Sequence, residues 1–332
     1  MTRTFSGIKP TGHLTLGNYL GALRQWVEVD QHKSDALFCV VDLHALTVDH
    51  DPARIRRLSR QAATLMLAAG LEPARCTVFV QSHVDEHTRL SYLLECTASD
   101  GEMRRMIQYK EKSARERAAG GSVRLSLLTY PVLMAADILA YSADEVPVGE
   151  DQVQHVELTR DLAVRFNQRY GHTFTVPRAV HPTVAARVMD LQDPTSKMGK
   201  SHAETSGIVY LLDEAEVVRK KVMRAVTDSR GEVVYDREEQ PGVANLLEIL
   251  ASCTGGQPAE LASTYASYGA LKKDTADAVL ELLRPVHERH AELCADPGYV
   301  DAVLRAGAER ARTLARPTVD AAYAAIGLMP PA

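Results

Sequence analysis

Short apolar runs and helical patterns alternate in the first part of the chain. Residues 5–8 form an apolar run that ends in a Gly/Pro cluster, and residues 36–41 and 76–81 form two more. Between the first two runs, apolar residues recur at the spacing of one helix face at Leu16, Leu20, Leu23 and Val27. Asp51-Pro52 opens a second helical pattern, in which Asp51 is placed to cap the helix. This order of strands and helices predicts a parallel, Rossmann-like α/β sheet.

The middle of the chain departs from this alternation. Residues 88–128 are basic and helical in pattern, and a double glycine interrupts them, so we expect a helical insertion with a mobile loop. Residues 130–141 form a strongly apolar helix that contains one acid, Asp137. A short strand is expected within residues 143–149, followed by helical character over residues 150–170.

The second part of the chain lacks clear signals for parallel strands. It shows amphipathic helices separated by breaks near Gly231, Pro241 and Gly255. The predicted organisation is therefore a Rossmann-like domain over residues 1–205, with its helical insertion, followed by an all-α domain over residues 206–332.

Composition and charge place the chain among ordinary globular proteins. Of its 332 residues, 45% are hydrophobic and 24% are charged, and 38 basic residues against 43 acidic ones give no global attraction to nucleic acid. The five cysteines are scattered and never in C-x-x-C spacing, which favours reduced thiols in a cytoplasmic protein. No apolar run has the length of a membrane span, and the polar N-terminus has no signal-peptide core, so no membrane association is expected.

Residues 5–21 combine a strand, a glycine-containing loop and the start of a helix. Backbone N–H groups at such a helix start are unpaired and lie at the positive end of the helix dipole, which suits a phosphate. However, Gly12, Gly17 and Gly21 are too widely spaced for the dinucleotide fingerprint, and the P-loop consensus is absent. A phosphate site and a plain tight turn remain open as equal alternatives.

A second candidate segment, Lys-Met-Gly-Lys-Ser at residues 197–201, ends like a P-loop. Pro194 stands where that motif needs its first glycine, so the loop cannot wrap a phosphate in the same way. The two lysines either lie in a solvated loop or stabilise charge that builds on a transferring phosphate.

Other polar residues stand out against their surroundings. A lone acid such as Asp137 is rare in an apolar helix unless it is paired or contacts a ligand, and both alternatives stay open. Residues 149–152, Gly-Glu-Asp-Gln, place acceptors just past a strand end, where α/β proteins bind ligands. His83 and His87 have the H-x-x-E-H spacing of zinc peptidases, but they follow a strand at a turn, so no protein-bound metal is expected.

Ordered motifs run along the chain. They are Phe-Ser-Gly-Ile-Lys-Pro at 5–10, Leu-Thr-Leu-Gly-Asn-Tyr at 14–19, Val-Asp-Leu-His at 41–44, Leu-Thr-Tyr-Pro-Val-Leu-Met-Ala-Ala-Asp at 128–137, Val-Pro-Val-Gly-Glu-Asp-Gln at 146–152, Lys-Met-Gly-Lys-Ser at 197–201 and Ala-Val-Thr-Asp-Ser at 225–229. Over nearly its whole length the chain resembles bacterial tryptophanyl-tRNA synthetase, a class I aminoacyl-tRNA synthetase. In this resemblance, 14–19 corresponds to the His-Ile-Gly-His motif and 197–201 to the Lys-Met-Ser-Lys-Ser motif.

The resemblance implies a two-step reaction. Tryptophan and ATP would give tryptophanyl-adenylate and pyrophosphate, and tryptophan would then move to the terminal adenosine of tRNA(Trp). It also implies Mg²⁺ bound with ATP, a homodimer built through the helical insertion, and anticodon contacts from the C-terminal helices. Residues 1–205 would then be the catalytic domain and residues 206–332 the anticodon-binding domain.

The resemblance also implies roles for individual residues. ATP would be held by Lys9, Pro10, Thr11, Gly17, Asn18, Gly149, Glu150, Asp151, Val188, Lys197, Met198, Gly199, Lys200 and Ser201. Tryptophan would be bound by Phe5, Gly7, His44, Tyr130, Met134, Asp137, Val146, Val148 and Gln152. The catalytic groups would be Asn18, Lys112, Lys197, Lys200 and Ser201. In this assignment Asp137 accepts the indole N–H, and a buried acceptor rejects side chains that lack the donor.

Two positions depart from the family pattern. Gly199 stands in place of the middle serine of Lys-Met-Ser-Lys-Ser, which removes a hydroxyl and loosens the loop, although both lysines remain. Lys9 stands where the family usually has glutamine, and it brings a cation to the junction of ATP and tryptophan. We therefore hypothesise a variant with lowered sensitivity to inhibitors that mimic tryptophan.

Two other functions compete with this interpretation. Tyrosine activation is disfavoured by Asp137 within its long apolar segment. A synthetase-like paralogue that serves as a tRNA-binding or regulatory protein would be favoured by degraded lysines or a missing C-terminal region, and the chain has neither. Basic residues at 104–124 and at Arg305, Arg310, Arg312 and Arg316 either meet tRNA phosphates or form solvated helix faces.

Overall fold

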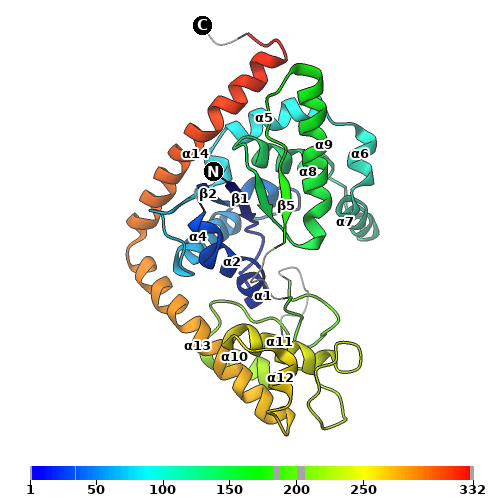
Figure 1. Ribbon diagram of the computed structural model, residues 1–332, viewed down its shortest axis with the longest axis vertical. Helices are drawn as coiled ribbons and strands as arrows, with labels where there is room; N and C mark the ends of the chain where they lie inside the picture. Colours follow the sequence, from blue (N-terminus) through cyan, green and yellow to red (C-terminus); the bar gives the residue numbers. More distant parts are fainter. Residues whose placement is uncertain (1, 34, 182–186, 200–205, 330–332) are drawn as a thin grey trace.

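A five-stranded parallel sheet forms the centre of the protein. The computed structural model describes residues 2–33, 35–181, 187–199 and 206–329. The strands are β1 (Arg3–Ile8), β2 (Asp35–Val40), β3 (Cys76–Val80), β4 (Glu145–Pro147) and β5 (Arg178–Val180), in the spatial order β3-β2-β1-β4-β5. All neighbouring strands are parallel, which confirms the Rossmann-like α/β class (Figure 1).

Helices surround the sheet and continue beyond it. Those of the first part are α1 (Leu16–Asn18), a π-helical turn at Tyr19–Leu23, α2 (Arg24–Glu28), α3 (Asp42–Ala45), α4 (Pro52–Ala68), α5 (Glu86–Glu95), α6 (Asp100–Arg105), α7 (Ile107–Ala118), α8 (Leu125–Leu139) and α9 (Val153–Tyr170). Short 3-10 turns lie at Asp30–His32, Gln81–His83 (η3) and Glu150–Gln152. The later helices are α10 (Ala215–Met223), α11 (Pro241–Thr254), α12 (Pro258–Ala262), α13 (Tyr268–Ala295) and α14 (Pro297–Ala325). None of the described helices has the length and apolar character needed to cross a membrane.

The apolar run that predicted β2 is buried on both sides. Ala36, Phe38 and Val40 pack into one core cluster, and the alternate residues Leu37 and Cys39 pack into the other. This follows from the period of two along a strand, which sends successive side chains to opposite faces. The first cluster joins α2, α4 and the later helices, whereas the second lies under α5, α8 and α9.

Local capping confirms two predicted helix starts. The Asp51 carboxylate accepts a hydrogen bond from the backbone N–H of Arg54, and Pro52 is the first residue of α4. Thr15 and Asn18 form a capping box that starts α1, because each side chain accepts a backbone N–H of the other. The loop after β1 therefore enters its helix with a fixed direction.

The edge strand β5 was not predicted. It has three residues, Arg178–Val180, with no apolar run, and it pairs with β4 only. Arg178 is mostly exposed and forms an ion pair with Glu145 on β4. An edge strand of three residues carries almost no periodic signal, which explains why the sequence pattern did not indicate it.

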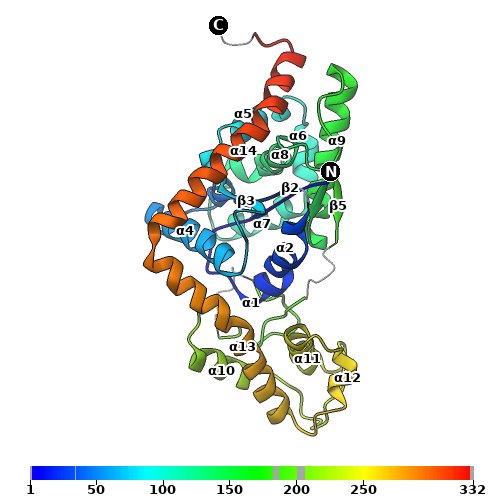
Figure 2. The same ribbon diagram turned by 60° about the vertical axis from the view of Figure 1, so that its left-hand side comes forward.

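The last described helix returns to the sheet. Helices α10 to α13 form a unit at one end of the molecule, and α14 then runs back along the sheet domain (Figures 1 and 2). Ala311, Ala315 and Val319 of α14 are fully buried in the cluster shared with α5 and α8. The helical half is thus divided between a separate unit and one helix that completes the core of the sheet domain.

The backbone of α14 lies directly against the sheet at Gly307. A Cβ atom added there would lie 1.9 Å from the carbonyl oxygen of Val78 on β3. We therefore expect Gly307→Ala to lower the free energy of unfolding by about 1–3 kcal/mol or more, because the backbone of the sheet cannot move aside. Chemical denaturation measures this change.

Gly269, at the exposed start of α13, provides the matched control. Nothing lies within 4 Å of a Cβ added at that position, so Gly269→Ala should leave stability unchanged or slightly higher. Equal losses in the two variants would contradict close packing of α14 on β3.

Candidate active site

A cavity of about 400 Å³ opens at the carboxyl ends of β1 and β4. In the sheet, β2 and β3 lie on one side of β1, whereas β4 and β5 lie on the other side of β1. Such a switch point is where open α/β sheets bind ligands. The predicted site residues that line the cavity are Phe5, Gly7, Lys9, His44, Lys112, Tyr130, Met134, Asp137, Val146, Val148, Gly149 and Gln152.

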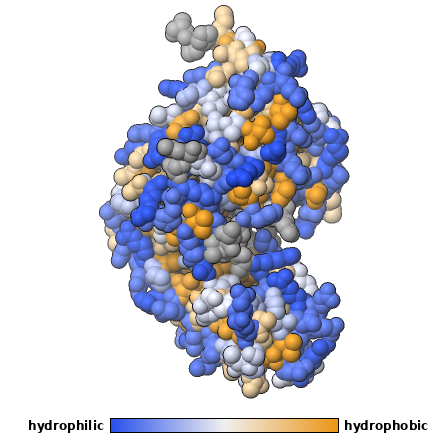
Figure 3. All heavy atoms as spheres, viewed as in Figure 1, coloured by the Kyte–Doolittle hydropathy of each residue, from blue (hydrophilic) through white to orange (hydrophobic). Residues whose placement is uncertain are grey.

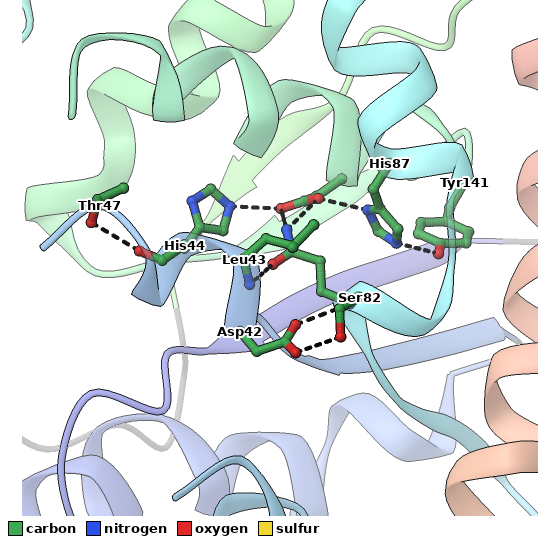
Figure 4. A network of polar contacts seen from close by, with 9 residues as sticks. Asp42, Leu43, His44, Thr47, Ser82, His87 and Tyr141 are labelled. Carbon is green, nitrogen blue, oxygen red and sulfur yellow. Dashed lines mark hydrogen bonds and ion pairs between the residues drawn. The ribbon is translucent and has the colours of Figure 1, made fainter. Parts of the chain in front are cut away.

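Asp137 is the most strongly bound polar side chain at this cavity. It is 1% exposed, and its Oδ1 accepts hydrogen bonds from His87 Nδ1 at 2.6 Å and Gln81 Nε2 at 2.8 Å. Its Oδ2 accepts hydrogen bonds from His44 Nε2 at 2.8 Å and Gln81 Nε2 at 2.9 Å. Figure 4 shows His44 and His87 reaching the shared carboxylate from opposite sides.

The surroundings of Asp137 keep its carboxylate ionised. Burial alone would raise its pKa, but the charge and hydrogen bonds of His87 and His44 outweigh burial and lower the pKa to about 2. The apolar helix therefore contains an ionised hydrogen-bond acceptor. Asp137 would need to be ionised whether it pairs with other side chains or contacts a ligand.

Three members of this network were missed by sequence reasoning. Gln81 directly follows the buried strand β3, and a polar residue at that edge was an available signal. His87 was considered only for zinc, yet its two ring nitrogens contact Asp137 and Tyr141, while His83 is exposed. Tyr141 ends the segment that contains Asp137, and its hydroxyl lies 2.8 Å from His87 Nε2.

Two lysines bring positive charge to the cavity. Lys9 Nζ donates to Thr47 Oγ1 at 3.0 Å, and burial together with the charge of Lys112 lowers the Lys9 pKa to about 8. Lys112 Nζ donates to Gln108 Oε1 at 2.8 Å and lies 5.6 Å from the centre of the Tyr130 ring. Burial also lowers the pKa of Lys112.

A second unpredicted histidine supports the wall of the cavity. His155 Nε2 lies 2.8 Å from the Tyr130 hydroxyl, and the histidine is almost fully buried. Burial and the nearby Lys112 lower its pKa to about 4, so the ring is neutral at physiological pH. A neutral ring holds Tyr130 without adding a third cation beside the two lysines.

The remaining predicted residues lie outside the cavity lining. They are Pro10, Thr11, Gly17, Asn18, Asp151, Val188, Lys197, Met198 and Gly199. The side chain of Glu150 is not among those that the structure describes. Lys200 and Ser201 lie outside the described residues. Among the described positions, Lys197 and Asp151 are exposed, and the Asp151 carboxylate accepts a hydrogen bond from Gln152 at 2.7 Å.

Two of these residues bring the separated motifs into contact. A Cβ added to Gly17 would lie 2.9 Å from the carbonyl oxygen of Met198, so only glycine permits this approach. The backbone N–H of Leu16 donates to the carbonyl of Val209 at 2.8 Å, which ties the start of α1 to the segment that follows the lysine motif. Figure 3 shows the surface indented between the sheet domain and the helical unit.

Several basic residues proposed as phosphate contacts are bound within the protein. Arg310 pairs with Asp35 at 3.3 Å, and Arg312 donates to the carbonyl of His83 at 2.6 Å. Arg124 pairs with Asp49 at 2.7 Å. These arginines tie α14 and the insertion to the sheet domain.

Comparison with known proteins identifies the family. The model for class I tRNA synthetases (W and Y) matches residues 1–284. The chain is 80% identical over 331 residues to "Tryptophan--tRNA ligase 1" of Streptomyces coelicolor, covering 100% of this chain and 98% of that protein. It is 50% identical over 331 residues to "Tryptophan--tRNA ligase 2" of Streptomyces avermitilis, covering 99% and 97%.

Solved structures agree. Tryptophanyl-tRNA synthetase from Mycoplasma pneumoniae superposes with a TM-score of 0.92 at 36% identity, over 99% of this chain and 98% of that one. The Campylobacter jejuni enzyme complexed with ADP and tryptophan gives 0.82 at 32% identity, over 98% and 100%. The chain therefore belongs to the class I tRNA synthetases. Within that class it falls in the bacterial tryptophanyl-tRNA synthetase family and is a tryptophan–tRNA ligase.

The lowered pKa of Lys9 gives a pH prediction. Lys9 carries its charge below about pH 8 and loses it above, so kcat/KM for ATP should fall as pH rises through about 8. Pyrophosphate exchange measured across pH tests this. Lys9→Gln should abolish this fall of kcat/KM at high pH. The same fall in the variant would show that another group, such as Lys112, causes it.

Proposed function

We propose that the cavity binds tryptophan and that the Asp137 carboxylate accepts its indole N–H. The support is an ionised, buried acceptor at the wall of a cavity that apolar side chains also line, with Phe5, Met134 and Val146 among them. A hydrogen bond to a charged, buried acceptor discriminates strongly against side chains that lack the donor.

ATP is proposed to lie between this cavity and the contact of Gly17 with Met198. Lys9 and Lys112 supply cations from the cavity lining. We assign the positive end of the helix that begins at α1, and Lys197 and Lys200 of the second motif, to the phosphate groups. Mg²⁺ enters with ATP as part of the nucleotide substrate. Among the described residues, no group of His, Cys, Asp and Glu side chains is arranged to hold a metal.

The chemistry then needs no protein nucleophile. A carboxylate oxygen of tryptophan attacks the α-phosphorus, forming the new P–O bond of the adenylate while the bond to pyrophosphate breaks. The protein contributes alignment of the reacting atoms and stabilisation of charge on the transferring phosphate. In the second step a hydroxyl of the terminal adenosine of tRNA takes the tryptophanyl group and AMP leaves.

We further propose that the molecule is a cytoplasmic homodimer and that the unit of α10 to α13 meets the anticodon. Large apolar side chains are exposed on the helical insertion, with Tyr92 on α5, Ile107 on α7 and Leu125 on α8. Such a concentration of exposed apolar residues supports a protein interface on the insertion.

Asp137 carries this proposal and provides its test. In tryptophan-dependent ATP–pyrophosphate exchange, Asp137→Asn should lower kcat/KM for tryptophan about 10- to 100-fold while KM for ATP changes little, because the charged acceptor is lost. Tyrosine competed in the same assay should not be activated by the native protein. Unchanged use of tryptophan by a folded variant would show that the indole binds elsewhere.

The cation at position 9 is also proposed to lower sensitivity to tryptophan-mimicking inhibitors. Lys9 lines the same cavity as Asp137, so an analogue that relies on a neutral amide at this position would lose that contact. Lys9→Gln should therefore bind such a compound more tightly, measured as a lower inhibition constant in the exchange assay. The same inhibition constant in both proteins would end this proposal.

A further inference from the structure

We infer that His87, held by Tyr141, is a positioning residue for amino-acid selection, acting through Asp137 without touching the substrate. The inference rests on the proposed contact between Asp137 and the indole N–H. Beyond that contact, we infer that His87 and Tyr141, which lie outside the cavity lining, fix the orientation of the Asp137 carboxylate.

The first step is the fixed orientation of the carboxylate. Asp137 lies on α8, whereas its donors come from three other elements: His44 from α3, Gln81 from η3 and His87 from α5. Donors on both oxygens from separate elements prevent rotation about the terminal torsion. The Gln81 amide is itself oriented, because its Oε1 accepts the backbone N–H of Leu43 at 3.0 Å (Figure 4).

The second step separates indirect from direct donors. His44 lines the cavity, so a change there would also alter the surface that a ligand touches. His87 is fully buried and is absent from the cavity lining. Its hydrogen-bonded link to the cavity runs through Asp137.

The third step concerns the proton on His87. Asp137 is ionised and can only accept, so His87 carries a proton on Nδ1, where it points at Asp137 Oδ1 at 2.6 Å. Tyr141 is fully buried, burial raises its pKa so that the hydroxyl keeps its proton, and this hydroxyl lies 2.8 Å from His87 Nε2. Tyr141 thus holds the far side of the ring whose Nδ1 donates to the carboxylate.

Packing reinforces this chain of hydrogen bonds. The Tyr141 ring stacks on Phe5, with ring centres 5.6 Å apart and planes 13° apart, and Phe5 lines the cavity. His87 and Tyr141 also meet edge to face at 5.4 Å. The residues behind Asp137 are therefore packed against the wall of the cavity as one unit.

The test compares two substrates in pyrophosphate exchange: tryptophan and β-benzothienylalanine, in which a ring sulfur replaces the indole N–H. His87→Leu should lower kcat/KM for tryptophan about tenfold or more and change that for the sulfur analogue much less, so the preference for tryptophan shrinks. The loss should appear in KM for tryptophan more than in kcat. His87→Asn, whose amide nitrogen can replace Nδ1 as donor, should restore part of the preference.

Each result decides between positioning and general support of the fold. Equal losses for both substrates, or an unchanged preference, would overturn the inference, because a merely structural role affects both alike. If His87→Leu does not fold, Tyr141→Phe serves in its place with a smaller shrinkage of about twofold to fivefold. If the native protein does not prefer tryptophan over the sulfur analogue, the proposed Asp137 contact fails first, and the inference falls with it.

Discussion

One buried, ionised carboxylate sets the architecture of this active site. An unpaired charge in the apolar helix α8 would be costly, so donors must reach Asp137 from several directions. They come from the segments after β2 and β3, which share the carboxyl edge of the parallel sheet. The order of the strands thus delivers His44, Gln81 and His87 to one point. The cavity beside these residues is therefore lined by a carboxylate whose orientation is fixed.

A second constraint joins the motif that begins at Leu14 to the motif that begins at Lys197. The backbone of Gly17 touches that of Met198, although the two motifs are far apart in the sequence. The capping box of Thr15 and Asn18 directs α1 toward this contact, and the backbone bond from Leu16 to Val209 secures it. The segment that carries Lys197 and Met198 is thereby held against the start of α1.

Sequence reasoning succeeded where the signal is local and failed where contacts are distant. The apolar run of β2 and the cap at Asp51 depend on neighbouring residues, and both were predicted. Asp137 stood out because an acid in an apolar helix is unusual. Its hydrogen bonds with Gln81 and His87 could not be derived, since the partners lie 50 or more positions away and only the fold brings them close. The same reason hid the packing of α14, whereas β5 is too short to leave a periodic signal.

The return of α14 to the sheet also bears on the order of events during synthesis. The hydrogen bond from Arg312 on α14 to His83 spans 229 residues. The segment that carries Gln81 and His87 therefore emerges from the ribosome long before α14, which covers it. Until α14 is made, the face of β3 beneath Gly307 remains exposed to water. Contacts of such long range form slowly. The core cluster that α14 shares with α5 and α8 is therefore completed only after nearly the whole chain has been made.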